Sequence, residues 1–144
     1  RADIERISDY FESILDNVTL IDDFDVYGHL DYVVRYCPSA EKIFRISDYK
    51  EVFEQIFKKI IPKGKGIGIN TGSLYKNMSY AHPHMDILKL YKDMGGEIIT
   101  VGSDAHKPEY LCYDFETYAR DALTSLGYRY YCTFKNRKPE FNPL

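Results

Sequence analysis

The sequence predicts an α/β fold with a parallel sheet, and three observations support this prediction. Short apolar runs rich in β-branched residues alternate with segments whose apolar residues recur at helical spacing. Successive apolar runs begin roughly 30 to 40 residues apart, the length that a βα unit requires. Glycine and proline residues stand between the segments and mark turns. The 144 residues suffice for one domain, or part of one, with a buried core.

Each element follows from the local pattern of apolar residues. Helices are expected at residues 3–16, 48–61, 83–94 and 115–126, the last two closed by Gly95 and Gly127. Strands are expected at residues 22–28, 66–71, 97–101 and 128–134. Residues 32–47 are expected to form a loop with a short helical turn, and residues 135–144 a polar tail. Four parallel strands would form either a small open sheet or half of a barrel.

Composition and charge exclude several classes of partner. A net charge of −3 and a pI near 5.8 give no basic surface for nucleic acid or anionic lipid. No apolar run approaches the ~20 residues of a membrane span. The cysteines Cys37, Cys112 and Cys132 form no paired motif, which favours a reducing, cytoplasmic location.

Side chains that can bind metal follow three of the predicted strands. His29 follows the first strand, Asn70 the second, and Asp104 with His106 the third. Parallel strands bring their carboxyl ends to one edge of a sheet, so these side chains should share an edge. Imidazole nitrogen and carboxylate oxygen are common ligands of Zn, Mn and Fe. The sequence therefore predicts a divalent metal site at that edge.

Structural roles remain open for the same residues. His29 could order a loop, and Asp104 could cap a turn, as Asp often does. His82 and His84 are expected to cap a helix or to lie at the surface. Arg35 is either an anion ligand near the edge or a solvated cation.

Four short motifs follow one another within residues 20–135: Gly28-His29-Leu30-Asp31, Lys65-Gly66-Ile67, Ile69-Asn70-Thr71 and Ser103-Asp104-Ala105-His106. In this order and combination they resemble the histidinol-phosphate phosphatase branch of the PHP (polymerase and histidinol phosphatase) superfamily. The resemblance implies a distorted (β/α)7 barrel with a trinuclear metal centre at its carboxyl rim. It also implies hydrolysis of a small phosphomonoester, with a place in histidine biosynthesis.

The resemblance also implies roles for individual residues. His29, Asp104 and His106 match metal ligands of the family and would be the catalytic residues of this chain. Arg35 falls where an arginine that binds the substrate phosphate is expected. Asn70 matches an asparagine that lines the substrate site.

Two departures from the family pattern shape the expected domain organisation. The paired His-x-His ligands and bridging Glu of the family have no counterpart in this sequence, and Gly68 occupies a position where this branch usually has Glu. Residues 1–144 are therefore expected to be a single segment, the C-terminal part of a PHP domain. Such a segment would pair with an N-terminal half or self-associate, and its activity alone is doubtful. The alternatives are a non-catalytic α/β scaffold module and a phosphate-binding domain without hydrolysis.

Overall fold

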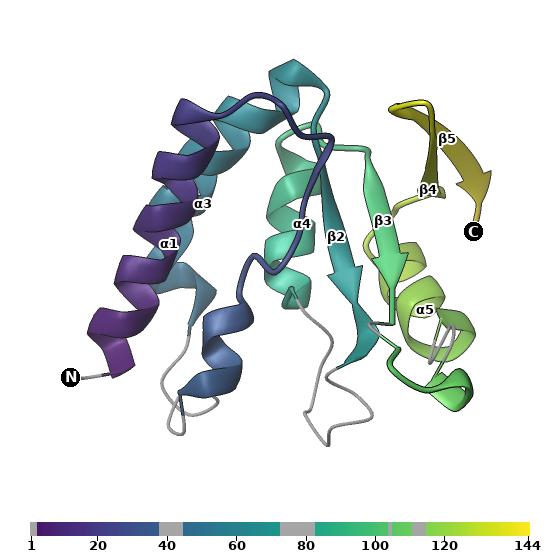
Figure 1. The fold of residues 1–144 in the computed structure, drawn as a ribbon, viewed down its shortest axis with the longest axis horizontal. Coiled ribbons are helices and arrows are strands. Elements are labelled where there is room, and N and C mark those ends of the chain that lie inside the picture. Colours follow the sequence, from purple (N-terminus) through teal and green to yellow (C-terminus); the bar gives the residue numbers. More distant parts are fainter. Residues whose placement is uncertain (1–2, 38–44, 73–82, 104, 111–114) are drawn as a thin grey trace.

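Three parallel strands form the central sheet of the protein. The computed structural model describes residues 3–37, 45–72, 83–103, 105–110 and 115–144. The strands β1 (Val26–Tyr27), β2 (Gly66–Asn70) and β3 (Ile99–Gly102) lie side by side in that order. In the register between β2 and β3, Ile67 is opposite Ile99 and Asn70 is opposite Gly102. The predicted α/β class with parallel strands is confirmed (Figure 1).

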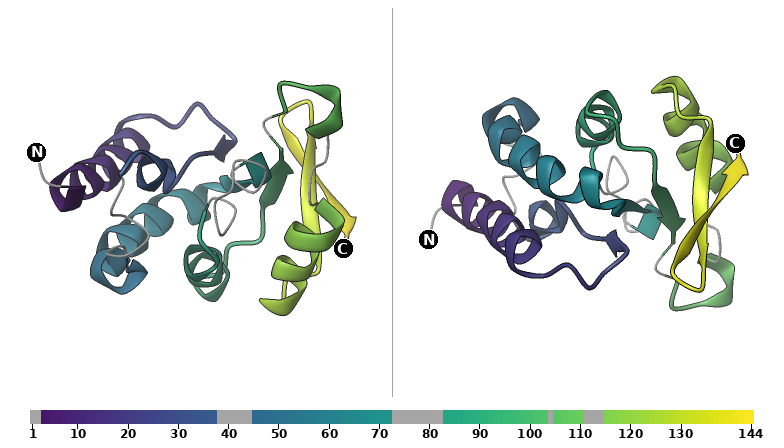
Figure 2. Two further views of the ribbon diagram at one scale, coloured as in Figure 1. Left: turned by 90° about the horizontal axis from the view of Figure 1, so that it is seen from below. Right: turned by 90° about the horizontal axis from the view of Figure 1, so that it is seen from above.

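Helices cover one face of this sheet. The helices are α1 (Asp3–Leu20), α3 (Ile46–Ile60) and α4 (Met85–Asp93), and Figures 1 and 2 show α1 and α3 side by side. The ring centroids of Phe11 and Phe53 are 4.7 Å apart at the contact between α1 and α3. α1 extends beyond its predicted end at residue 16, and the added residues include the buried Val18. At the start of the helix, Ile4 is 61% exposed and does not contribute to the core. The buried core includes Ile7, Phe11, Ile14, Val18, Leu30, Phe53, Ile56, Phe57, Ile60, Ile67, Ile87, Leu88, Tyr91 and Ile99.

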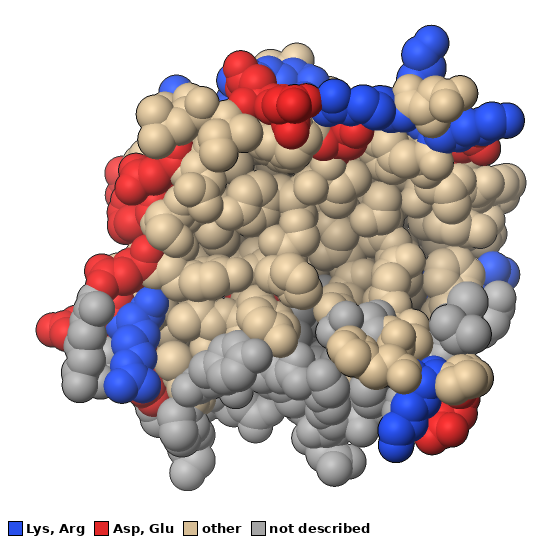
Figure 3. Space-filling view, in the orientation of Figure 1, with Lys and Arg blue, Asp and Glu red and all other residues tan. Residues whose placement is uncertain are grey.

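The opposite face of the sheet carries small and uncharged residues. Ile67 and Ile69 of β2 are buried, and Gly68 between them faces the other way. A Cβ placed on Gly68 would lie 3.2 Å from the Thr100 hydroxyl and 3.8 Å from a methyl group of Val26. Figure 3 shows this side of the molecule, with charged side chains along its margins and an uncharged centre.

The C-terminal segment differs from the prediction. Residues 128–134 were expected to add a parallel strand and residues 135–144 a tail. Instead β4 (Tyr130–Lys135) pairs antiparallel with β5 (Lys138–Pro143) in a separate two-stranded sheet. The two prolines of β5 argued against a strand, but β5 pairs on one side only, where proline is tolerated.

The turn of this hairpin is tied to the segment before β1. Asn136 and Arg137 have φ values of 52° and 62°, the left-handed conformation of a two-residue hairpin turn. The Arg137 guanidinium lies 2.8 Å from an Asp23 oxygen and 3.0 Å from an Asp25 oxygen. These two carboxylates raise the pKa of Arg137 above its ordinary value. The hairpin is thereby held at the amino end of the sheet.

The remaining elements agree with the sequence apart from details at their ends. A 3₁₀ turn occupies Tyr32–Tyr36, as the expected short helical turn, and the last helix opens with a π-helical turn, Phe115–Ala119, before α5 (Arg120–Ser125). Gly95 has a φ of 97°, and the Gly96 N–H donates to the Tyr91 carbonyl at 2.8 Å, which closes α4 as predicted.

Two of the three cysteines lie among the described residues. Cys37 and Cys132 are buried free thiols, and burial raises the pKa of both, whereas Cys112 lies outside the described residues. Within the described ranges, every helix is too short or too polar to cross a membrane.

Candidate functional site

The carboxyl ends of β1, β2 and β3 lie at one edge of the sheet, called here the carboxyl rim. His29 follows β1, Asn70 is the last residue of β2, and the segment with Ser103 and His106 follows β3. The parallel pairing therefore brings three of the predicted site segments to the same edge (Figure 1). Asp104 and the side chain of Arg35 lie outside the described residues, so their predicted roles remain predictions.

His29 has an unusual backbone conformation. Its φ of 56° is left-handed, which is uncommon for a residue other than glycine. Its carbonyl oxygen accepts a hydrogen bond from the Tyr10 hydroxyl of α1 and another from the Tyr32 N–H at 3.2 Å. The residue is exposed, and its ring centroid lies 4.7 Å from that of Tyr32. His29 therefore has an accessible imidazole, and two hydrogen bonds to its carbonyl oxygen hold its backbone in place.

Asp31 ties the segment after β1 to the beginning of α4. Its side chain is fully buried, and one carboxylate oxygen accepts a hydrogen bond from the His84 N–H at 2.9 Å. His84 caps α4 through its Nδ1 atom, which accepts from the Asp86 N–H at 3.1 Å. The capping role expected for His84 is confirmed, and it explains why α4 begins at Met85 rather than at residue 83; His82 is not among the described residues.

No functional role was predicted for Asp31. Its carboxylate stands two positions after His29 in the Gly28-His29-Leu30-Asp31 motif. A fully buried carboxylate must have hydrogen-bond partners, and here one of them comes from another element of the rim. The position of Asp31 in the motif could have indicated a role for it. Its hydrogen-bond partner, His84, is 53 positions away in the sequence and is brought close only by the folded structure.

Asn70 and Thr71 organise the loop that leaves β2. The Asn70 side-chain oxygen accepts from the Gly72 N–H at 2.7 Å, a local turn typical of Asn. The buried Thr71 hydroxyl donates to the Gly102 carbonyl at 3.5 Å, across to the end of β3. The Asn70 side chain therefore has a structural role at the carboxyl rim, because its hydrogen bond with Gly72 shapes the loop after β2.

The donor atoms at the carboxyl rim are of a kind that divalent metals bind. His29 and His106 are both exposed, and imidazole nitrogens with the carboxylate of Asp104 form a donor set suited to Zn. The described residues, which omit Asp104, contain no group of three His, Cys, Asp or Glu side chains close enough to hold an ion. The residue types fit a metal, but the described part of the chain does not supply a complete ligand set.

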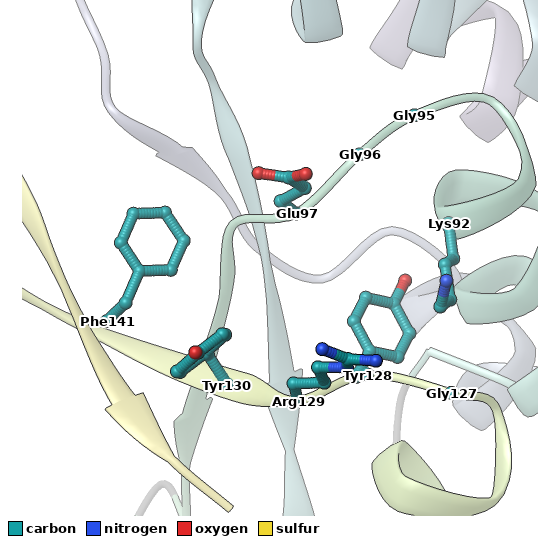
Figure 4. Close-up of a pocket in the computed structure, with 9 residues that line it drawn as sticks. All are labelled: Lys92, Gly95, Gly96, Glu97, Gly127, Tyr128, Arg129, Tyr130 and Phe141. Carbon is teal, nitrogen blue, oxygen red and sulfur yellow. The ribbon is translucent and has the colours of Figure 1, made fainter.

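A cavity of about 570 Å³ lies away from the carboxyl rim. Figure 4 shows Tyr130 and Phe141 on one side of it, Lys92 with Tyr128 on the other, and Glu97 between them. Its lining comes from the loops that close α4 and α5 and from the hairpin strands. The described residues that line it include no histidine or cysteine, and none of the predicted metal ligands is among them.

Comparisons with known proteins agree with the fold and with the motifs at the carboxyl rim. No protein-family model matches the chain. Histidinol-phosphatase of Lactococcus lactis is 30% identical over 140 residues, which are 96% of this chain and 51% of the relative. A probable histidinol-phosphatase of Thermotoga maritima is 30% identical over 126 residues, 88% of this chain and 51% of the relative.

A solved structure extends the likeness to three dimensions. The crystal structure of histidinol phosphate phosphatase from Lactococcus lactis, in complex with zinc, L-histidinol and phosphate, matches with a TM-score of 0.78. The match is 28% identical in sequence and covers 97% of this chain and 52% of that one.

The chain is thus an α/β protein built from parallel strands and covering helices, and nearly all of it is similar to known phosphatases. The relatives are histidinol-phosphatases, so the resemblance to this branch that the motifs predicted is confirmed. The chain spans about half the length of the curated relatives it matches.

Proposed function

We propose that the protein is a metal-dependent phosphomonoester hydrolase of the histidinol-phosphatase type. The observation that carries the proposal is the match, over 97% of the chain, to a phosphatase crystallised with zinc, L-histidinol and phosphate. The carboxyl rim supports it independently, since His29 follows β1 and His106 follows β3, two strands of one parallel sheet with β2 between them. The substrate class we propose is a small phosphate ester such as histidinol phosphate, in histidine biosynthesis in the cytoplasm.

We further propose that the chain corresponds to the C-terminal part of a (β/α)7 barrel. Three parallel strands with helices on one face are what part of such a barrel would contain. The opposite face is uncharged at its centre (Figure 3), and within the described residues β1 pairs with β2 alone. Unpaired strand edges favour association with another chain segment. An N-terminal half or a second copy would therefore complete the sheet.

Each residue at the carboxyl rim has a distinct role in this proposal. His29, Asp104 and His106 would hold divalent ions, which are Zn, Mn or Fe and number three in the intact family. Bound ions would supply Lewis-acid polarisation of the phosphoryl group and a hydroxide nucleophile at neutral pH. Asp104 would accept a proton from the attacking water. Arg35 would pair its planar guanidinium with the phosphate, and Asn70 would line the site.

The test measures bound metal and phosphatase activity together. The protein is loaded with Zn or Mn, its metal content is determined, and hydrolysis of p-nitrophenyl phosphate and histidinol phosphate is followed. His29→Ala and His106→Ala should each lower metal affinity at least about 10-fold, because each removes a ligand. His84→Asn is the matched control, since it also removes an imidazole but keeps a good helix cap. Unchanged metal affinity in both alanine variants would refute the proposed site.

A non-catalytic binding or scaffold module is the second candidate, and Gly68 favours it. The resemblance places Glu at this position, which lies on the open face of the sheet beside Thr100. The loss of that carboxylate is expected to weaken the site. Full metal occupancy with no turnover on either substrate, even after addition of the N-terminal half of a relative, would support the module instead of the enzyme.

A further inference from the structure

We propose that Tyr10 is a positioning residue for His29, holding the backbone from which the imidazole reaches the carboxyl rim. The inference rests on the proposed function, since it treats His29 as a metal ligand. Tyr10 belongs to α1, which contributes none of the predicted ligands. The inference therefore gives this helix a part in the site beyond covering the sheet.

The first support is the conformation of His29. A left-handed φ of 56° is disfavoured for a residue with a Cβ, so surrounding contacts must hold it. The contacts are on its carbonyl oxygen, which accepts from the Tyr10 hydroxyl and from the Tyr32 N–H. The Tyr32 bond is local and forms with the helical turn, whereas the Tyr10 bond joins two separate elements.

The second support is that Tyr10 is itself firmly placed. Its neighbour Phe11 is fully buried and packs against Phe53 of α3. The Tyr10 and Phe11 rings meet edge to face with centroids 6.1 Å apart. Tyr10 itself is partly buried and packs against this core, which places its hydroxyl on the His29 carbonyl oxygen.

The third support is that the chain is held directly after the exposed His29. Leu30 and Asp31 are fully buried, and the Asp31 carboxylate accepts from the His84 N–H. Gly28 and His29, just before these contacts, are both open to solvent. Small backbone rotations at these two residues would swing the imidazole away from the other ligands, and the Tyr10 hydroxyl opposes them.

The test is a double-mutant cycle on zinc affinity. Tyr10→Phe keeps the ring and removes the hydroxyl, and zinc affinity should fall about 10-fold, at the lower end of losses for residues that orient ligands. In a His29→Ala background the same change should cause no further loss. Tyr128→Phe is the matched control, because the Tyr128 hydroxyl also donates to a backbone carbonyl, that of Leu88, at 2.6 Å. It should leave zinc affinity within two-fold, on the order of experimental error.

The outcomes separate this inference from the proposed function. Equal losses from Tyr10→Phe with and without His29 would overturn the positioning role, as would no loss at all. If His29→Ala binds zinc as tightly as the parent protein, the proposed site fails instead. A metal-free measurement then still decides the inference: the Cα and Cβ chemical shifts of His29 should move in Tyr10→Phe but not in Tyr128→Phe. Unchanged shifts would refute it.

Discussion

Gly66→Ala should disrupt the pairing of β2 with both of its neighbours. A Cβ on Gly66 would stand 2.5 Å from the Ile98 Cγ2 atom and 2.7 Å from the Ile98 carbonyl oxygen. That oxygen accepts from the Ile67 N–H at 3.0 Å and from the Tyr91 hydroxyl at 3.3 Å. On the other side, the Gly66 N–H donates to the Asp25 carbonyl at 2.9 Å. The new methyl group has no space unless the strands separate.

The expected cost follows from these contacts. Overpacking of a filled interior destabilises by about 1–3 kcal/mol. Weakening the bond from Ile67 to Ile98 adds about 0.5–1.5 kcal/mol. A compatible Gly→Ala change instead stabilises by about 0.4–1 kcal/mol through the unfolded chain, which offsets part of the loss. The free energy of unfolding should therefore fall by about 2–3 kcal/mol.

Urea unfolding monitored by circular dichroism measures this change. Gly102→Ala is the matched control, since Gly102 ends β3 in the same sheet and a Cβ there meets no atom within 4 Å. The control should change stability by less than about 0.5 kcal/mol at an unchanged m-value. Equal midpoints for the two variants would refute the argument that close approach of Ile98 requires glycine at position 66.

Three further changes test other parts of the structure. Asp31→Ala leaves the His84 N–H without its acceptor and should cost about 1–3 kcal/mol in thermal or urea unfolding; an unchanged midpoint would contradict the bond. Burial raises the pKa of Tyr91 to about 12, so folding favours its neutral form. Stability should then fall as pH rises from about 10 to 12, by on the order of 1 kcal/mol per pH unit, and less steeply in Tyr91→Phe. Gly68→Glu should strengthen zinc binding, with Gly68→Gln as the uncharged control; equal affinities would exclude a ligand at this position.

The parallel sheet could be predicted because its strands are apolar and widely spaced. Ile67, Ile69 and Ile99 are buried, as the apolar segments that contain them indicated. The apolar faces of the helices are buried with them in the same core. The hairpin could not be predicted, because Pro139 and the charged residues around it resemble a tail. The two strands are held together by cross-strand pairs such as Cys132 with Phe141. Such pairing is not revealed by the strand propensity of either segment alone.

The candidate site was predictable only as a set of strand ends. His29 and His106 follow their strands as expected, Asn70 is the last residue of its strand, and parallel pairing brings these strand ends together. The Tyr10 hydroxyl on the His29 carbonyl spans 19 positions and depends on how α1 packs on α3. Tertiary packing of this kind leaves no local mark on the sequence.

The bond between Arg137 and the Asp23–Asp25 segment has a consequence for the order of folding. The partners are 112 and 114 positions apart, so they meet only after most of the chain has been organised. Contacts that form after the rate-limiting step slow unfolding without accelerating folding. We therefore expect the docked hairpin to lengthen the lifetime of the native state rather than to accelerate its formation.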